Sequence, residues 1–443
     1  MGLEFPKHPF RTGGGVVVPH RKNTWEKESA ILPMPSRVTL PMLQHIGAPC
    51  QPMVKKGDYV FAGQKIADSD AFVSAPIHAS VSGTVSGIVP VTLTGGQVVD
   101  AVVIDSDGKM DYGADLQPPK DVNTRQALTK AARESGLVGL GGAGFPAHVK
   151  LNVPQDKHIE VLIVNAAECE PYVTSDHREA LENGKNILDG VHRIREIYGV
   201  SRIILAVEDN KPDVIEKLRE IAATYGGKSV CVLPLKSRYP QGAEKVLVQA
   251  CTGIKIPVGK LPADVGCMVM NIASVSFLAS YLRTGKPLTR KRVTVDGSAV
   301  KSPQNVIAPV GTQIRELIEF CGGYSTQPEK IIMGGPMMGV AVISDELPII
   351  KQNNAILALD EKESKLIEPS SCIRCGRCMA VCPMRLMPRN LEKAVEKKDT
   401  ERTLELDIKT CMECGCCAYS CPAGRRLVQA IRLGKHYLRR EGK

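Results

Sequence analysis

The sequence has 443 residues, of which 43% are hydrophobic and only 4% aromatic, and its formal net charge is +10. That length suggests about three domains, and so few aromatic side chains exclude a surface that stacks successive nucleic-acid bases. No apolar run approaches the roughly 20 residues needed to cross a bilayer, and the first ten residues lack a signal-peptide pattern. We therefore expect a soluble, cytoplasmic protein that can still sit on a membrane surface.

The first quarter of the chain changes from an irregular arm to short strands. Residues 1–35 are rich in glycine, proline and charge, which predicts an arm without regular structure. Residues 36–115 hold short apolar runs divided by glycine and proline turns, typical of an all-β domain. The stretches VKKGDYVFAGQKIA and SAPIHASVSGTV resemble the flattened barrel of biotinyl and lipoyl carrier domains. Residues 74–85 lack the lysine that carriers modify, so the resemblance implies a lipoyl-like barrel-sandwich without a carrier function.

Residues 120–287 alternate between helical and strand patterns. Apolar runs predict buried strands, and amphipathic, charged segments separate them, which favours a Rossmann-like α/β domain with helices layered on a sheet. Asn123 or Thr124 can cap the first helix, which runs to about Ser135. The strands are expected at 159–164, 202–207, 229–233 and 266–270, and the later helices at about 176–198, 212–225, 242–251 and 273–283.

Two smaller modules follow. Residues 288–350 contain the strand-like stretches RVTVDG and NVIAPV, a short helix that Thr312 is expected to cap, and the further strand KIIMGGPMMGV. That order fits a β-grasp module of the SLBB type. Residues 360–443 are mostly helical segments around cysteine motifs. The last helix carries an apolar stripe, which favours packing on this domain over docking to a membrane partner or anionic lipid; the stripe consists of Leu427, Ala430, Ile431 and Leu438.

Eight of the fifteen cysteines form two copies of the motif C-x2-C-x2-C-x3-C-P, offset by 39 residues. Three thiolates from one loop can bind three corners of a [4Fe-4S] cubane, and in two-cluster ferredoxins the fourth cysteine ligates the other cluster. The pattern therefore predicts a ferredoxin-like domain with two [4Fe-4S] clusters. The first cluster is expected on Cys372, Cys375, Cys378 and Cys421, and the second on Cys411, Cys414, Cys417 and Cys382.

A pair of zinc sites is the alternative, because C-x2-C pairs also bind zinc. Zinc gives no reason for a third evenly spaced cysteine and a following proline in both copies. Cys416 breaks the pattern and is interpreted as a spare thiol. Residues 371–443 carry 16 Lys/Arg against 8 Asp/Glu, and two clusters of formal charge about −2 each leave about +4. Much of this basic charge therefore offsets the clusters rather than attracting nucleic acid.

A dense glycine loop follows the first helix of the α/β domain, with Gly139, Gly141, Gly142 and Gly144 in GLGGAGFP. Its spacing matches neither the dinucleotide fingerprint nor the Walker loop. Residues without a Cβ let backbone N–H groups approach a phosphate or a flat ring, and Lys150 can add a positive charge. Taken alone, the loop predicts such a site without identifying its ligand.

The stretch GLGGAGFPAHVK resembles the GRGGAGFPTGLK loop of the flavin- and NADH-binding subunit of respiratory complex I. NAAECEP, YPQGAEK and NIAS follow in the order of that family's other flavin-site motifs, and the β-grasp module and cluster domain come next, as they do there. The N-terminal arm and barrel narrow the resemblance to the C-subunit family of the Rnf ion-translocating electron-transport complex, over nearly the whole chain.

This resemblance implies FMN and two [4Fe-4S] clusters as cofactors and NAD(H) as substrate. In this family hydride transfer takes place at the flavin, so the resemblance implies no catalytic side chain. Three departures concern the NADH contacts: Ala167 and Ala243 stand where complex I has acidic residues, and no aromatic residue follows Lys150. Flavin-site positions are implied for Gly139, Gly141, Gly142, Gly144, Lys150, Asn165, Glu168, Tyr239, Gly242, Asn271 and Ser274, and NADH contacts for Phe145, Glu170 and Glu244.

The implied function is that of a peripheral subunit at the cytoplasmic face of the inner membrane. It transfers electrons between NADH, FMN and the clusters, and on to membrane-embedded and iron–sulfur subunits of the same complex. In the Rnf family this transfer is coupled to ferredoxin and to ion pumping, and the pump lies in other subunits. One alternative is the FMN and iron–sulfur cobalamin reductase of propanediol-degrading bacteria, which resembles the family in flavin loop and cluster repeat. Another is a non-catalytic electron-wire adaptor whose flavin site has decayed.

Overall fold

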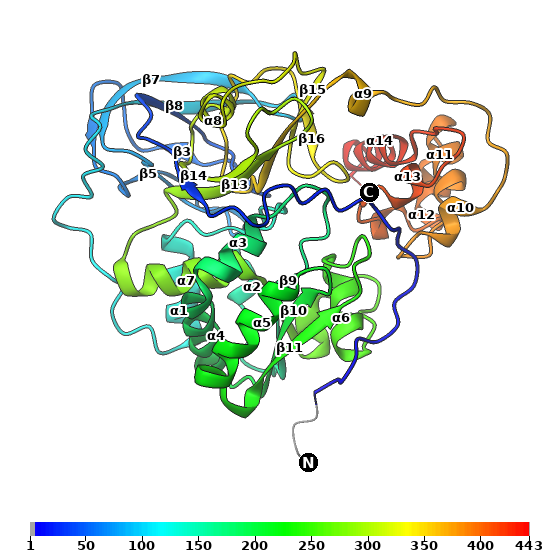
Figure 1. Ribbon diagram of the computed structural model, residues 1–443, viewed down its shortest axis with the longest axis horizontal. Coiled ribbons are helices and arrows are strands. Elements are labelled where there is room, and N and C mark those ends of the chain that lie inside the picture. Colours follow the sequence, from blue (N-terminus) through cyan, green and yellow to red (C-terminus); the bar gives the residue numbers. More distant parts are fainter. Residues whose placement is uncertain (1–4, 443) are drawn as a thin grey trace.

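The computed structural model describes residues 5–442, so the first four residues of the predicted arm and the final residue of the cluster domain lie outside the described part. Figure 1 shows the barrel and β-grasp parts above the α/β domain, the helical cysteine domain at one edge, and the N-terminal arm crossing between them. The parts follow one another in the predicted order. Within residues 5–442, no helix is both long and apolar enough to span a membrane.

Two small antiparallel sheets form the barrel-sandwich domain, which confirms the expected fold. One sheet has the strand order β2-β8-β7-β4 and the other β3-β5-β6. Alternate side chains such as Leu40, Ile66 and Ile104 point inward and are fully buried, as expected where one face of a strand meets a core. The strands are β2 (Arg37–Pro41), β3 (Gln51–Pro52), β4 (Tyr59–Val60), β5 (Lys65–Asp68), β6 (Ile77–His78), β7 (Gly83–Thr92) and β8 (Val98–Ser106).

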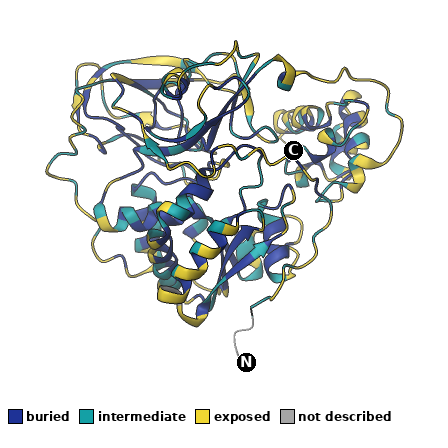
Figure 2. Cartoon of the chain, viewed as in Figure 1, coloured by how far each residue is buried: buried dark blue, intermediate teal, exposed yellow. Residues whose placement is uncertain are grey.

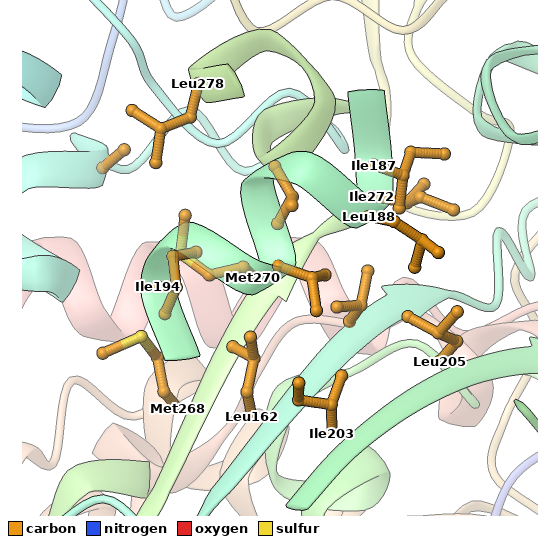
Figure 3. Packing of buried hydrophobic residues seen from close by; sticks show 14 of the residues in the cluster. Leu162, Ile187, Leu188, Ile194, Ile203, Leu205, Met268, Met270, Ile272 and Leu278 are labelled. Atoms are coloured by element: carbon orange, nitrogen blue, oxygen red, sulfur yellow. The ribbon is translucent and has the colours of Figure 1, made fainter. Parts of the chain in front are cut away.

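A four-stranded parallel sheet with the order β11-β10-β9-β12 forms the centre of the α/β domain, and all four predicted strands are confirmed. Figure 3 shows the aliphatic side chains that pack between this sheet and its helices, among them Leu162, Ile194 and Ile203. The elements are β9 (Val161–Ala166), β10 (Arg202–Glu208), β11 (Val230–Leu235), β12 (Cys267–Asn271), α1 (Arg125–Glu134), α2 (Ala147–Leu151), α3 (Ser175–Glu182), α4 (Gly184–Tyr198), α5 (Pro212–Ile221), α6 (Glu244–Thr252) and α7 (Ile272–Thr284).

Two local predictions for this domain have different outcomes. Thr124 caps α1, and its hydroxyl accepts a hydrogen bond from the Ala127 N–H, as predicted. The single helix expected over 176–198 is wrong, because Asn183 leaves the helical conformation (φ −125°) and separates α3 from α4. The hydrophobic periodicity continues across this break, so the pattern alone could not reveal it.

The β-grasp sheet has six strands in the order β1-β14-β13-β17-β15-β16. It includes two strands outside the expected bounds 288–350: β1 (Ala30–Ile31) comes from the arm, and β17 (Ala355–Leu359) lies between β13 and β15. The predicted Thr312 cap is wrong, because Gln313 occupies the N-cap and the Thr312 hydroxyl donates to the Pro309 carbonyl. The remaining elements are β13 (Arg290–Asp296), β14 (Gln304–Pro309), α8 (Ile314–Phe320), β15 (Lys330–Met333) and β16 (Val340–Val342).

Short helices surround the two cysteine motifs in the C-terminal domain. The last helix buries Leu427, Ile431 and Leu438 within the domain, and Gly434 faces Val395 of α11 so closely that a Cβ would clash. The expectation that this stripe packs on its own domain is therefore confirmed. The helices are α9 (Glu361–Ser364), α10 (Arg377–Ala380), α11 (Pro388–Glu396), α12 (Thr400–Glu405), α13 (Cys416–Tyr419) and α14 (Leu427–Arg440).

The N-terminal arm is mostly irregular, as predicted, but it is closely packed against the rest of the chain. The Phe10 N–H bonds the Ala250 carbonyl in the α/β domain, and the Gly15 N–H bonds the Val381 carbonyl in the cysteine domain. Val16 forms a bridge with Tyr239, and β1 then joins the β-grasp sheet. The arm therefore ties three folded parts together.

Candidate functional site

The glycine loop lies on the N-terminal end of α7. The Leu140 N–H donates to the Ser274 hydroxyl at 3.0 Å, and a Cβ added at Gly141 would lie 2.7 Å from the Asn271 amide nitrogen. Gly142 and Gly144 adopt positive φ angles of 108° and 64°, a conformation that glycine adopts without strain. The loop is thus a close-fitting cradle of bare backbone, and residues 141–143 are exposed to solvent.

Asn271 connects this loop to the interior of the domain. Its side-chain oxygen caps α7 by accepting from the Ser274 N–H, and its amide donates to the Asp176 carboxylate at 2.6 Å. Burial, with the nearby charge of Glu168, raises the pKa of Asp176 to about 7. Asn165 lies at the carboxyl end of the neighbouring strand and donates to the Gly242 carbonyl at 2.9 Å. Carboxyl ends of parallel strands are the usual ligand-binding edge of such sheets.

Glu168 stands at the N-terminus of α3. Its carboxylate accepts from the Asp176 N–H at 2.6 Å and from the His177 N–H at 3.2 Å, a favourable position for a negative charge. Lys22 of the arm donates to three backbone carbonyls of this segment, those of Glu168, Glu170 and Val173. The arm therefore fixes the loop that carries both glutamates.

Lys150 and Glu244, two predicted contact residues on different helices, form an ion pair of 2.6 Å. Lys150 also donates to the Val269 carbonyl on β12. The structure thus brings the lysine, the glutamate and the strand edge together beside the glycine loop. Their predicted contacts with FMN and NADH stay predictions.

The Glu170 carboxylate accepts hydrogen bonds from the Met337 and Met338 N–H groups of the β-grasp module, both at 2.9 Å. Burial raises the pKa of this carboxyl to about 7, against the opposing effects of these N–H groups, of Lys22 and of Tyr239. Glu170 therefore joins two domains, and its predicted contact with NADH remains a prediction.

We expect Glu170→Gln to flatten the pH dependence of stability. A carboxyl whose pKa rises on folding contributes stability that is complete below its unfolded pKa and lost as pH rises through its folded pKa. Between pH 5 and 8 the wild type should lose about 2 kcal/mol relative to the variant, after allowance for partial exposure of the side chain. Thermal unfolding at the two pH values measures this, with Glu346→Gln, an exposed site, as control. Parallel pH profiles for wild type and Glu170→Gln would contradict the assignment.

Some residues near the loop were missed by sequence reasoning. The Asn354 amide donates to the Gly141 carbonyl at 3.4 Å, and the Gln352 side chain fills the space where Gly144 lacks a Cβ. Both precede β17, beyond the bounds expected for the β-grasp module, where the polar run QNN between apolar stretches was the available signal. His148, four residues after the loop, is buried on α2, where a ring nitrogen meets the Phe72 carbonyl at 3.0 Å. The ring of Phe145, at the end of the loop, is partly buried.

The cysteines of the two motifs lie close to one another, and their assignment as ligands of two clusters stays a prediction. Cys378 lies near Cys372 and Cys421, whereas Cys382 lies near the thiols of the other motif. A small cavity is lined by five cysteines, Cys382, Cys411, Cys414, Cys416 and Cys417, and otherwise mainly by apolar residues. Among residues 5–442, no three His, Cys, Asp or Glu side chains converge tightly enough to hold a single metal ion.

Cys416 lines this cavity and also contacts the α/β domain. Its thiol is fully buried and donates to the Tyr239 carbonyl at 3.8 Å. Val16, Val18, Tyr239, Cys414 and Cys416 form one buried cluster, with Cys169 and Met337 packed against it. The second cysteine motif is therefore in direct contact with the α/β domain, which holds the glycine loop and is called the glycine-loop domain below.

Family models match four consecutive parts of the chain. They are the RnfC barrel sandwich hybrid domain over residues 10–109, the Nuo51 FMN-binding domain over 132–280, the SLBB domain over 292–341 and the 4Fe-4S dicluster domain over 371–425. These ranges agree with the barrel, the α/β domain, the β-grasp module and the cysteine domain described above.

Named relatives match over almost the full length. The chain is 44% identical to the C subunit of the proton-translocating ferredoxin:NAD(+) oxidoreductase complex of Clostridium ljungdahlii, over 96% of this chain and 92% of the relative. It is 41% identical to the C subunit of the Na(+)-translocating complex of Acetobacterium woodii, over 97% and 98%. It is 37% identical to the C subunit of the ion-translocating oxidoreductase complex of Rhodobacter capsulatus, over 98% and 84%.

A solved NAD+-reducing [NiFe]-hydrogenase shares the fold with a TM-score of 0.51 and 16% identity, over 73% of this chain and 66% of that one. The glycine cradle that a Cβ would fill and the cysteine thiols around one cavity fit the groups that the family models name. FMN and two [4Fe-4S] clusters are therefore the cofactors of this chain.

Proposed function

This chain belongs to the family of C subunits of ion-translocating ferredoxin:NAD(+) oxidoreductase complexes, and from that premise we propose that it is the NADH-reacting subunit of such a complex. It takes electrons from NADH and passes them to iron–sulfur and membrane-embedded partner subunits, or runs the reverse reaction. FMN, when bound, supplies the change from a two-electron hydride to the single electrons that a [4Fe-4S] cluster accepts.

The contact between the glycine-loop domain and the second cysteine motif carries this proposal. Tyr239 contributes its backbone carbonyl to the Cys416 thiol, and Gly242, three residues later, bonds Asn165 at the strand edge beside the loop. Both cofactor-binding parts therefore share one short segment. Its apolar neighbours exclude water from the contact, which keeps the two redox sites close and insulated.

The residues around the glycine loop position the reactants. Gly141, Gly142 and Gly144 would lie against FMN, and the Asn271 cap with Ser274 would hold the loop on α7. Lys150 and Glu244 offer opposite charges at the strand edge, and Phe145 would face the nicotinamide. No side chain is needed to move a proton in the hydride step, so binding and orientation are the tasks of the protein.

The alternatives receive less support. The arm and barrel, matched over residues 10–109 by the RnfC domain model, favour the Rnf family over a cobalamin reductase. The closely fitting glycine loop disfavours the alternative of a non-catalytic adaptor whose flavin site has decayed. We place the protein at the cytoplasmic face of the membrane, where NADH and ferredoxin are available, with its membrane-embedded partners supplying the ion path.

The test is direct. The full chain, loaded anaerobically with FMN, iron and sulfide, should reduce an artificial one-electron acceptor with NADH, and flavin absorbance should bleach before the cluster absorbance. The same chain without FMN, but with complete clusters, is the control and should lose nearly all of the rate. A fully loaded chain that NADH cannot reduce would rule out the catalytic proposal.

A further inference from the structure

The two cysteine loops repeat one backbone in two different surroundings. Arg374 and Glu413 hold equivalent positions with φ angles of 56° and 59°, and Gly376 and Gly415 follow with 73° and 82°. A four-residue helix then begins in each copy, α10 or α13. Because the local structure is shared, differences between the copies report what each loop faces.

The second loop faces the interior of the protein. Cys414, Cys416 and Cys417 are buried, and a Cβ on Gly415 would lie 3.0 Å from the Met337 carbonyl of the β-grasp module. Its acidic residue, Glu413, is paired with Arg432 and Lys435 of α14 at 2.9 and 2.7 Å. This loop therefore has its contacts within the chain.

The first loop faces solvent. Cys375 is exposed, and the apolar side chains Ile373 and Met379 beside it are 68% and 50% exposed. The segment leading into the motif adds Leu366 and Ile367 at 63% and 67%; Figure 2 shows this stretch as mostly exposed. A single exposed apolar residue is ordinary, whereas several around one site mark a binding surface.

Two arginines, Arg374 and Arg377, lie between Ile373 and Met379 in the chain. Arg374 and Arg377 form no ion pair within the described residues 5–442, although they occupy the positions of Glu413 and the buried Cys416 in the other copy. Two unpaired arginines beside apolar side chains would attract a partner with acidic residues around an apolar centre.

We propose that Ile373, Arg374, Arg377 and Met379 form an exit surface that docks a redox protein with an acidic rim, and that electrons leave the chain through the first cysteine motif. The inference rests on the proposed function and specifies the partner's chemistry. Each handover moves one electron, which oxidises this chain and reduces the partner's one-electron centre, and no bond or proton is exchanged. The second cysteine loop, which faces the interior, receives electrons from the α/β domain, and the first loop, which faces solvent, delivers them to the partner.

The test reverses the charge of the exit surface in the full, cofactor-loaded chain with R374E/R377E. Glutamate fits position 374, because Glu413 has the same backbone there, and position 377 begins a helix, where negative charge is favourable. The matched control is K55E/K56E, which makes the same charge change on exposed barrel residues. The probe is membrane containing the other subunits of the complex, from a strain that lacks this chain.

Stopped-flow spectroscopy should show unchanged flavin and cluster reduction by NADH in R374E/R377E, but electron handover to the membrane slowed about tenfold at low salt, with a weaker salt dependence. K55E/K56E should stay within about twofold of wild type. Equal slowing in both doubles, or none in the first, would overturn the proposal.

Two further experiments test for other binding partners of the exit surface. A wild-type dimer in sedimentation experiments that R374E/R377E breaks would assign the surface to a second copy. Binding to phosphatidylglycerol vesicles that the double abolishes would assign it to lipid; either result overturns the proposal. Dithionite-reduced chain tests handover even where NADH fails as reductant, so failure of the proposed function stays distinguishable from failure of the exit surface.

Discussion

Replacing Cys382 by serine is expected to remove the cluster of the second cysteine motif, although Cys382 belongs to the first. Its thiol lies with Cys411, Cys414 and Cys417 around one cavity, whereas Cys421 lies near Cys378. Iron content should fall from about eight to about four atoms per chain. The EPR signal that remains in Cys382→Ser should match that of Cys414→Ser, since both variants lose the same cluster. For the same reason the signal of Cys421→Ser should match that of Cys375→Ser.

Electron transfer from NADH to the partner subunits should be almost abolished in Cys382→Ser, because the lost cluster is the one next to the α/β domain that holds the glycine loop. NADH should still bleach the flavin. The control is Cys416→Ser, which changes a buried thiol outside the ligand set and should keep about eight iron atoms. If Cys382→Ser gave the spectrum of Cys375→Ser, each motif would hold its own cluster and the crossed assignment would be wrong.

Gly141→Ala is expected to reduce FMN affinity by more than about tenfold, which corresponds to about 1.4 kcal/mol. The added Cβ would lie 2.7 Å from the Asn271 amide nitrogen. That amide cannot move aside easily, since the same side chain bonds Asp176 and the Ser274 N–H. The loop must therefore shift away from α7, and the cradle for the cofactor opens.

FMN released on denaturation and flavin fluorescence titration measure the change. Gly87→Ala is the control, because its Cβ would meet nothing within 4 Å, and it should retain full FMN. Iron content should be unaffected in both variants, which separates a local effect from misfolding. Full FMN occupancy in Gly141→Ala would show that the loop lies elsewhere in the loaded protein.

Features set by short stretches of sequence were predictable. The repeat of eight cysteines, the four buried strands of the α/β domain and the Thr124 cap depend on neighbours a few residues away. The glycine loop was also evident, since close backbone approach requires residues without a Cβ. Its ligand was not evident from the residues alone and came from resemblance to a known family.

Features set by distant contacts were not predictable. Asn354 and Gln352 reach the glycine loop only because β17 lies between β13 and β15 in the β-grasp sheet. His148 is buried because the barrel segment around Phe72 covers it. Cys416 resembled a spare thiol until its contact with Tyr239 was seen, across 177 residues of sequence. In each case a second domain decides the environment of the residue.

The arm has a consequence for how the protein is made. Its residues leave the ribosome before those of the folded parts, and their partners around Tyr239, Ile307 and Val381 follow hundreds of residues later. Domains generally fold in order of synthesis, so the arm must wait while the barrel and the α/β domain take shape. Only a chain translated through its second cysteine motif can bury Val16 and Val18 against Cys414 and Cys416 of that motif. The arm is thus synthesised before these partner segments and packs only after they have been made.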